Sequence, residues 1–374
     1  MATERIKLNP DGTDSPQIEK IARVLAGGAL VAIPTETVYG IAANAGLDDS
    51  VRRLRSIKGH AADRPFTVHI GRRAACDDFV PDIPPMGRRL IRKGWPGPLT
   101  LVFRLDDPAR APAHATLSPE GAAAAYVHQT IGLRLPDHPV AAAILAAAGA
   151  PIIASSANET GASPPTTADA VSEALDGRID LIVDTGRTRY GQGSTIVKLN
   201  GTGYELLRTG VYDARTIRRW ATVNILFVCT GNTCRSPMAA GIFRKMAAER
   251  LSCDVSQLLE RGVNIESAGT SGGGGSASPS AVEVCRRRGV DIASHRARAL
   301  SLDHIRPADR IYTMSRHHLE TVAAMDPESV AKTSMLDPGD QDIADPIGGT
   351  VEDYDATASK ISVALERRLE EVPL

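Results

Sequence analysis

The hydrophobic pattern of the first 216 residues alternates short apolar runs with stretches of helical spacing. Residues 48–58 predict a helix, because Val51, Leu54 and Ile57 fall on one of its faces. The apolar runs predict buried strands at residues 29–34, 66–70, 99–105, 131–135, 151–155, 181–183 and 195–199, and a further helix is predicted at residues 140–148. This mixture of strands and helices indicates an α/β fold.

A second α/β pattern begins at Val223. Its predicted strands are residues 224–229, 264–267 and 310–313, and its predicted helices are residues 236–251, 281–288, 317–324 and 351–371. The regular alternation of strands and helices favours a doubly wound parallel sheet. A length of 374 residues fits two domains. We expect them at residues 1–216 and 222–374, with the boundary between residues 212 and 222.

Composition and charge exclude several classes of protein. The 43% hydrophobic and 23% charged residues are typical of soluble globular proteins, and 43 Lys and Arg against 44 Asp and Glu exclude a nucleic-acid binder that relies on bulk charge. Five cysteines are too sparse for a disulfide framework, and no paired spacing indicates a metal site. The longest apolar run, residues 140–154, is interrupted by Gly149 and Pro151 and is too short to span a bilayer. We therefore expect a cytoplasmic protein without a membrane partner.

The sequence Cys-Thr-Gly-Asn-Thr-Cys-Arg-Ser-Pro at residues 229–237 lies between a predicted strand and a predicted helix. A short loop at this place can turn its backbone N–H groups toward a tetrahedral anion, and the helix adds its positive end. Arg235 can hold two phosphate oxygens with its planar guanidinium, and the same positive field favours the thiolate form of Cys229. The motif predicts a phosphate site with a cysteine nucleophile.

A thiolate that attacks phosphorus needs an acid to protonate the leaving group. Asp345, which precedes a proline, lies in an acidic stretch that also contains Asp337, Asp340 and Asp342. On residue type alone, all four aspartates are candidates for this role.

Residues 223–371 resemble the low-molecular-weight protein tyrosine phosphatase family. The shared motifs are the loop at residues 229–237, Ser-Ala-Gly-Thr at residues 267–270 and Asp-Pro at residues 345–346. The resemblance implies that Cys229 is the nucleophile, that Arg235 binds the transition state and that Asp345 is the general acid. It also implies a phosphate-binding loop, supported by Ser267, that consists of Thr230, Gly231, Asn232, Thr233, Cys234 and Ser236.

Two positions favour a substrate other than phosphotyrosine. Thr233 and the sequence Asp-Pro-Ile-Gly-Gly at residues 345–349 resemble the bacterial protein arginine phosphatases, because the aromatic residues that hold a phenyl ring in other members do not follow the Asp-Pro pair. The resemblance implies a phosphoprotein substrate that carries phosphoarginine. An arsenate reductase on the same fold is a rival interpretation, but it needs resolving cysteines, and only Cys253 and Cys285 follow the loop.

Polar residues also gather at predicted strand ends in the first domain. Residues 34–37 follow one apolar run and residues 155–158 follow another, while Lys58, His60 and Arg64 gather at and just after the end of the first predicted helix. Each group alone is typical of a capped turn or a solvated surface. Their combination favours a site for a small anionic ligand such as a nucleotide.

Residues 18–212 resemble the YrdC-like threonylcarbamoyl-AMP synthase family. The shared motifs lie at residues 34–40, 58–59, 95–100, 134–139, 156–158, 177–180, 194–195 and 208. The resemblance implies a twisted α/β sheet with a concave, positively charged groove. It also implies an enzyme that joins L-threonine, bicarbonate and ATP, releases pyrophosphate and supplies threonylcarbamoyl-AMP to the tRNA-modification machinery, with Mg²⁺ accompanying ATP.

Motif positions in this family imply the site residues. L-threonine is expected at Thr35, His69, Arg134 and Ser194. ATP is expected at Lys58, His60, Arg64, Thr130, Ala154, Ser156, Asn158 and Arg208. His60 departs from the family, which has arginine at its position. An alternative therefore stays open, in which the phosphatase is joined to a catalytically weak nucleotide- or RNA-binding module.

Overall fold

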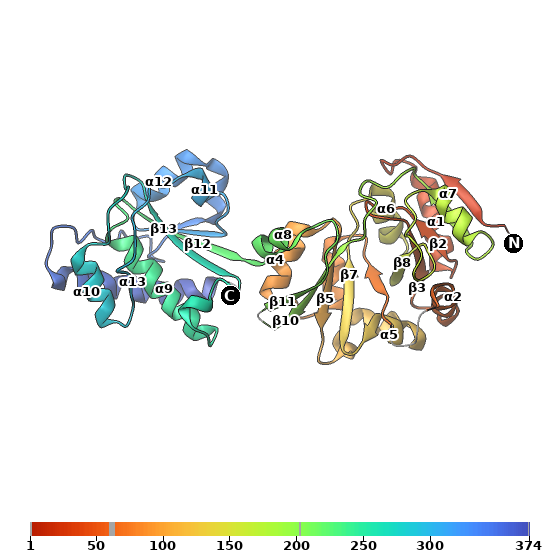
Figure 1. Cartoon of the computed structure of the whole chain (residues 1–374), viewed down its shortest axis with the longest axis horizontal. Helices are drawn as coiled ribbons and strands as arrows, with labels where there is room; N and C mark the ends of the chain where they lie inside the picture. The colour runs from red at the N-terminus through yellow and green to blue at the C-terminus, as the bar shows by residue number, and fades with distance from the viewer. Residues whose placement is uncertain (1, 60–63, 202, 373) are drawn as a thin grey trace. The chain divides into compact units, whose positions relative to one another are not determined.

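The computed structural model describes residues 2–59, 64–201, 203–372 and 374. The chain divides into two compact units, residues 1–220 and 221–374, each with its own sheet (Figure 1). The division falls at the end of helix α8 (Ala214–Ala221). The domain bounds expected from the sequence, residues 1–216 and 222–374, remain predictions.

The first unit is built on a mixed sheet of eleven strands within the described residues. In spatial order they are β1, β9, β2, β3, β8, β4, β7, β5, β10 and β11, with β6 paired to β7. Their bounds are β1 Glu4–Lys7, β2 Val31–Ile33, β3 Gly40–Asn44, β4 Thr67–His69, β5 Leu99–Arg104, β6 Tyr126–Val127, β7 Thr130–Arg134, β8 Ile152–Ser156, β9 Leu181–Asp184, β10 Thr195–Asn200 and β11 Gly203–Arg208. The sheet contains antiparallel pairs such as β3 with β8 as well as parallel pairs such as β4 with β7, so it is not a doubly wound parallel sheet.

Helices cover this sheet and close its core. Their bounds are α1 Ser15–Ala26, α2 Asp48–Lys58, α3 Cys76–Phe79, α4 Pro85–Gly94, α5 Pro119–Ala125, α6 Pro139–Ala147 and α7 Ala168–Leu175, followed by α8. Helix α2 has the bounds that its apolar spacing predicts. Helices α1 and α6 pack against each other and, through residues such as Leu25 and Ile144, against β2 and β8. The core fixes the strands whose ends carry the polar residues.

The second unit contains a parallel sheet in the order β13, β12, β14 and β15. The strand bounds are β12 Val223–Cys229, β13 Val263–Gly269, β14 Arg310–Thr313 and β15 Thr333–Met335. The helix bounds are α9 Arg235–Arg250, α10 Pro279–Arg287, α11 Leu302–Ile305, α12 Arg316–Met325 and α13 Val351–Glu371. The predicted doubly wound parallel sheet is confirmed for this unit.

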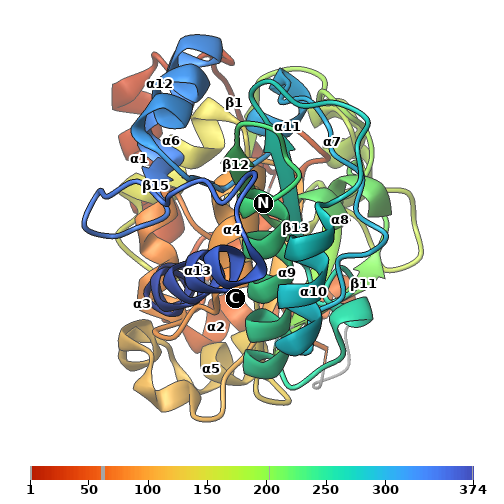
Figure 2. The same cartoon turned by 90° about the vertical axis from the view of Figure 1, so that its left-hand side faces the viewer.

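Both faces of β12 are buried, which explains its nearly continuous apolar sequence. Ile225 and Phe227 belong to the core formed with α9, α10 and α13, whereas Leu226 and Val228 belong to the core formed with α11 and α12. Figure 1 shows the two helical layers on opposite sides of β12 and β13, and Figure 2 shows α9, α10 and α13 together. None of the helices in the described parts of either unit is long and apolar enough to cross a membrane.

Parallel strands place their carboxyl ends at one edge of the sheet. In the register of β12 with β13, Cys229 lies opposite Gly269, and β14 ends beside Val228. The loops that begin at residues 230, 270 and 314 therefore start from the same edge, and this edge holds the candidate phosphatase site.

We predict that replacing Phe227 by Ala lowers the free energy of unfolding of the second unit by about 3–5 kcal/mol. The Phe227 ring is fully buried, with ring centroids 5.7 Å from Tyr312 and 5.6 Å from Phe243. Urea unfolding of the full chain, followed by far-UV circular dichroism, measures the loss.

The matched control is Val363→Ala, because Val363 is 57% exposed on α13; its effect should stay below about 0.5 kcal/mol. Trp95 and Trp220, the two tryptophans of the chain, both lie in the first unit. Their fluorescence transition should stay unchanged in Phe227→Ala. A loss below about 1 kcal/mol in the circular-dichroism transition would contradict a tightly packed aromatic cluster.

Candidate active sites

Cys229 ends β12, and the loop that follows folds around its sulfur. Ser236 Oγ lies 2.9 Å from Cys229 Sγ, and the Asn232 N–H donates to the same sulfur at 3.2 Å. The sulfur is buried, and the helix that begins at Arg235 adds its N-terminal end to the loop. Donors directed at a sulfur stabilise its anionic form. This geometry suits a thiolate nucleophile.

Asn232 holds the loop in an unusual backbone conformation. Its φ is 54°, in the left-handed region that few side chains other than Asn and Asp adopt readily. Its Nδ2 donates to Ser236 Oγ and Ser267 Oγ, both at 2.9 Å, and its Oδ1 accepts from the Arg298 N–H at 3.0 Å. His295 Nε2 lies 2.8 Å from its carbonyl oxygen. These contacts fix the shape of the loop, so the loop needs little further ordering when a phosphate group binds.

Two glycines let neighbouring backbone approach the loop closely. A Cβ atom at Gly269 would lie 2.5 Å from the Thr230 carbonyl oxygen, and one at Gly272 would lie 2.6 Å from the Gly231 carbonyl oxygen. Side chains are therefore excluded at both positions. The glycine-rich segment 271–276 lies beside the loop, and the Ser271 N–H donates to the Thr230 carbonyl.

Arg235 is anchored by three groups around the loop. Its Nη1 donates to the Ile343 carbonyl at 3.0 Å, and its Nη2 donates to Thr230 Oγ1 at 3.2 Å and forms an ion pair with Asp345. Its Nε is buried without a hydrogen-bond partner. Among the described residues, Asp345 is the one of the four candidate aspartates that contacts Arg235. The guanidinium of Arg235 is thus held against Thr230, the residue after Cys229, with its Nε donor unused.

His318 completes this arrangement, although the sequence interpretation missed it. Its Nε2 lies 2.9 Å from Thr230 Oγ1, and its Nδ1 lies 2.8 Å from Ser315 Oγ. Burial, with a smaller effect from Arg235, lowers its pKa to about 4, so the ring is neutral at pH 7. A neutral ring accepts a hydrogen bond at one nitrogen, which suits the Thr230 hydroxyl. The sequence showed a pair of histidines at residues 317–318, but nothing placed it near the loop.

The remaining cysteines do not form a resolving pair. Cys285 is fully buried in α10, and burial raises its pKa to about 12, which disfavours a reactive thiolate. Cys253 follows α9 and packs partly against the same core. Cys234, inside the loop, has its sulfur 3.2 Å from the Tyr354 hydroxyl. The arsenate reductase interpretation gains no support from these positions.

In the first unit, ten of the residues predicted to bind L-threonine or ATP line one groove. They are Thr35, Lys58, Arg64, His69, Arg134, Ala154, Ser156, Asn158, Ser194 and Arg208. Four of them carry a positive charge, and no carboxylate side chain occurs among the described residues of the lining. The groove therefore attracts an anion by its fixed charges.

Oxygens of the chain hold these cations in place. Lys58 Nζ donates to the Ser156 carbonyl at 2.7 Å and to the Asn158 carbonyl, and burial, together with Arg64, lowers its pKa to about 8. Arg208 donates through Nε to the Ser194 carbonyl at 3.0 Å. Because the partners of Lys58 and Arg208 are neutral, these two positive charges stay available to a ligand, whereas Arg134 is paired with the Glu36 carboxylate.

The structure does not bring every predicted residue to the groove. Thr130 stands at the first position of β7, at the opposite end from Arg134, and its hydroxyl donates to the Val127 carbonyl at 2.8 Å. His60 lies outside the described residues. His69 lines the groove, and burial followed by the effect of Arg134 lowers its pKa to about 3, so it serves as a neutral ring.

Comparison with models of protein families gives two matches. Residues 23–210 match the Sua5_yciO_yrdC model, described as telomere recombination. Residues 224–373 match the model described as low molecular weight phosphotyrosine protein phosphatase. The chain belongs to both families. The groove lies within the first match and the Cys229 loop within the second, so each candidate site belongs to one family.

Two relatives are similar to different parts of the chain. The threonylcarbamoyl-AMP synthase of Bacillus subtilis is 40% identical over 198 residues, which are 53% of this chain and 54% of that protein. The protein-arginine-phosphatase of Geobacillus stearothermophilus is 36% identical over 153 residues, which are 40% of this chain and 95% of that protein. The chain spans about half the length of the first curated relatives it matches. Both families to which it belongs contain enzymes.

Among solved structures, a double mutant of Sua5 from P. abyssi aligns with a TM-score of 0.51 and 23% identity. The alignment covers 88% of this chain and 98% of that chain. At this identity the likeness shows the fold alone. The mixed α/β architecture agrees with the α/β fold class expected from the sequence.

We predict that His318 makes the second unit less stable in acid. Its pKa is about 4 in the folded chain, below the ordinary 6.5, so between pH 6.5 and pH 4 the unfolded chain binds a proton that the folded chain does not. The free energy of unfolding therefore falls as pH falls through this window. His318→Gln should make the fall shallower, measured by urea unfolding at several pH values.

The control is His317→Gln, because His317 is the exposed neighbour. In His318→Gln the free energy of unfolding should still fall somewhat with falling pH, because burial also lowers the pKa of His295. An acid slope as steep in His318→Gln as in the native chain would contradict a neutral, buried His318.

Proposed function

We propose that the protein carries two enzyme activities. The first unit makes threonylcarbamoyl-AMP from L-threonine, bicarbonate and ATP and releases pyrophosphate. The observation that carries this proposal is the groove lined by Lys58, Arg64, Arg134 and Arg208 without a described carboxylate. The second unit is a cysteine-dependent phosphatase directed to phosphoarginine in proteins. The observation that carries it is the loop of donors around Cys229, with Arg235 and Asp345 beside it.

In the synthase reaction, the groove acts by placement and by charge. The amine of L-threonine takes up bicarbonate, loses water and becomes a carbamate, and a carbamate oxygen attacks the α-phosphorus of ATP as pyrophosphate leaves. Lys58 and Arg208 line the groove, and in this proposal their positive charges offset the charge of the phosphates. No side chain forms a covalent bond, so the rate depends on holding the two substrates in line.

Mg²⁺ enters this proposal as a companion of ATP. The described lining offers hydroxyls and backbone carbonyls but no carboxylate, which is the side chain that Mg²⁺ prefers in proteins. The Ser156 and Asn158 carbonyls already accept hydrogen bonds from Lys58, so the described lining does not offer a site of its own for this ion. The ion would supply further positive charge to the triphosphate, whose own oxygens would hold it.

In the phosphatase reaction, Cys229 Sγ attacks the phosphoryl group. The S–P bond forms as the P–N bond of phosphoarginine breaks, and Asp345 gives a proton to the leaving guanidino nitrogen. Water then breaks the S–P bond and releases inorganic phosphate. Arg235 binds the phosphoryl oxygens throughout, which requires that its ion pair with Asp345 opens when the substrate enters. That opening frees the carboxyl group for the leaving group.

Substrate choice is assigned to Thr233 and to the segment after Asp345. Thr233 lies in the loop with its hydroxyl 3.6 Å from Cys234 Sγ, and Gly275 stands across from its methyl group. A hydroxyl at this place suits a polar guanidinium better than a phenyl ring. The similarity to the Geobacillus protein-arginine-phosphatase, 95% of which is covered, supports the same choice.

Location and partners are part of the same proposal. The nucleophile Cys229 works as a reduced thiol, and ATP is an intracellular substrate, so the protein acts in the cytoplasm. Threonylcarbamoyl-AMP is an activated carbamate, and the tRNA-modification machinery is the proposed acceptor.

We predict that the full chain releases pyrophosphate from ATP only when L-threonine and bicarbonate are both present. Lys58→Met should raise the KM for ATP by about tenfold or more, because a buried charge-assisted contact is lost. In the native chain the KM for ATP should also rise between pH 7 and pH 9, as Lys58, whose pKa is about 8, loses its proton. Coupled pyrophosphate assays measure both.

Lys7→Met, at an exposed position of β1, is the matched control and should leave the KM for ATP unchanged. A native chain that binds ATP but releases no pyrophosphate would favour the alternative, a nucleotide-binding module joined to a phosphatase.

We predict that the full chain hydrolyses phosphoarginine peptides at least about tenfold faster than phosphotyrosine peptides of the same sequence. Thr233→Ile should move this ratio toward phosphotyrosine, because an aliphatic side chain replaces the hydroxyl. Phosphate release from both peptides gives the ratio of kcat/KM.

Cys229→Ser should lower both rates by about 1000-fold or more, whereas Cys253→Ser, in the same unit, should keep them. A preference for phosphotyrosine in the native chain would refute the assignment to phosphoarginine while leaving a cysteine phosphatase in place.

A further inference from the structure

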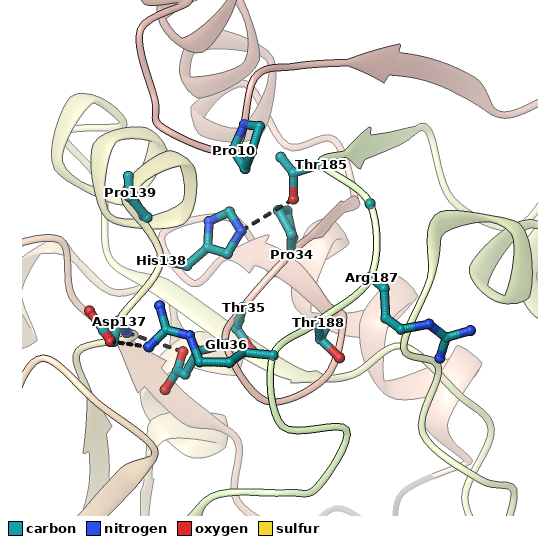
Figure 3. A pocket seen from close by; sticks show the side chains of 12 residues that line it. Pro10, Pro34, Thr35, Glu36, Asp137, His138, Pro139, Thr185, Arg187 and Thr188 are labelled. Carbon is teal, nitrogen blue, oxygen red and sulfur yellow. Dashed lines mark hydrogen bonds and ion pairs between the residues drawn. The ribbon is translucent and has the colours of Figure 1, made fainter.

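A buried ion pair separates two pockets of the first unit. Arg134 lines the groove described above, whereas Glu36 lines a second pocket, together with Asp137, His138 and Thr185. Figure 3 shows Glu36 beside Asp137 in the wall of this second pocket. Thr35 lines both pockets. The pair thus stands where the turn after β2 meets the end of β7.

Both carboxylate oxygens of Glu36 have partners. Oε1 accepts from Arg134 Nη2 at 2.8 Å, and Oε2 accepts from the Asp137 N–H at 3.1 Å. The side chain of Glu36 is 1% exposed and that of Arg134 is 7% exposed. Burial of two opposite charges is tolerated only when such hydrogen bonds satisfy them. The pair therefore has one geometry, which ties β7 to the segment that follows it.

This anchoring uses only part of the guanidinium. Glu36 and the Thr37 hydroxyl, at 2.7 Å, both bind Nη2 of Arg134. No hydrogen bond to Nη1 or Nε is made within the described residues, and Nε is buried. A buried N–H without a partner is costly unless a ligand completes it. Nη1 of Arg134 is thus an unused donor on a residue of the groove lining, and a carboxylate oxygen can accept a charge-assisted hydrogen bond from it.

We propose that Glu36 is a positioning residue for the synthase reaction, and this rests on the function proposed above. Glu36 holds Arg134 through Nη2, so that Nη1 is directed to the carboxylate of L-threonine. Glu36 is absent from the described lining of the groove, so it acts on the substrate through Arg134. The Thr37 hydroxyl alone would hold Nη2 without an opposite charge, which is weaker than the pairing with a carboxylate.

Glu36→Gln tests this with little change in shape. Both partners of Glu36 are donors, and glutamine has one acceptor oxygen, so one of the two hydrogen bonds is lost along with the charge. The KM for L-threonine should rise about tenfold or more, while the KM for ATP stays within about twofold. The native preference for L-threonine over L-threoninol, which lacks the carboxylate, should shrink by a similar factor, measured as competition in the pyrophosphate assay.

Asp137→Asn is the matched control, because the Asp137 side chain is 43% exposed and pairs with the exposed Arg189. It makes the same carboxylate-to-amide change next to Glu36 and should leave both KM values unchanged. A merely structural role for Glu36 would lower kcat by reducing the folded fraction and leave the KM for L-threonine unchanged. That result would overturn the proposal.

Failure of the proposed function looks different from failure of this inference. A native chain without threonine-dependent pyrophosphate release refutes both. A native chain that is active, with the same KM for L-threonine in Glu36→Gln, refutes the role of Glu36 alone. If Glu36→Gln does not fold, Glu36→Asp takes its place. Its shorter carboxylate cannot reach both partners, so the KM for L-threonine should rise severalfold with the KM for ATP kept, and an unchanged KM for L-threonine overturns the role.

Discussion

Neutral carbonyl oxygens anchor a buried cation in each candidate site, and both sites depend on the positive charge that this anchoring leaves uncancelled. Lys58 binds the Ser156 carbonyl in the first unit, and Arg235 binds the Ile343 carbonyl in the second. A carbonyl satisfies an N–H donor without cancelling its charge. At Lys58 the positive charge is left for an anionic ligand, whereas at Arg235 it is paired with Asp345 until the substrate enters. Both proposed reactions act on a phosphoryl group. The net charge of the chain, which is close to zero, gives no sign of these local positive charges.

Strand register brings the required groups together from distant parts of the sequence. In the first unit, Gly40 pairs with Ser156 and His69 pairs with Arg134, so the end of β8 meets the start of β3, and the ends of β4 and β7 lie together. In the second unit, parallel pairing places Cys229 opposite Gly269. The absence of a side chain at Gly269 then lets the two loops touch. The two sheets differ in topology, but in both of them strand pairing brings residues that are distant in sequence together at the strand ends.

Much of this arrangement could be predicted from local sequence, and the rest depends on distant contacts. Helix α2 and the strand–loop–helix around Cys229 follow from apolar spacing and from one continuous motif, and family motifs imply most of the groove. Strand β15, with three residues, has too little periodicity to be recognised, and the segment near the start of the chain that forms β1 is polar and mostly exposed. His318 contacts Thr230 across 88 residues of sequence, and Glu36 contacts Arg134 across 98. Such partners carry no local signal, because packing alone brings them together.

The two arginine–carboxylate pairs differ in a way that separates their roles. Each of Arg134 and Arg235 has a buried Nε without a partner, which marks both as incomplete without a ligand. The partner of Arg134, Glu36, is 1% exposed and bound at both oxygens, so it cannot leave. The partner of Arg235, Asp345, is 35% exposed on a loop, and water can replace its contact. Glu36, which is fixed, can orient Arg134. Asp345, which can release Arg235, can instead turn to the leaving group and give it a proton.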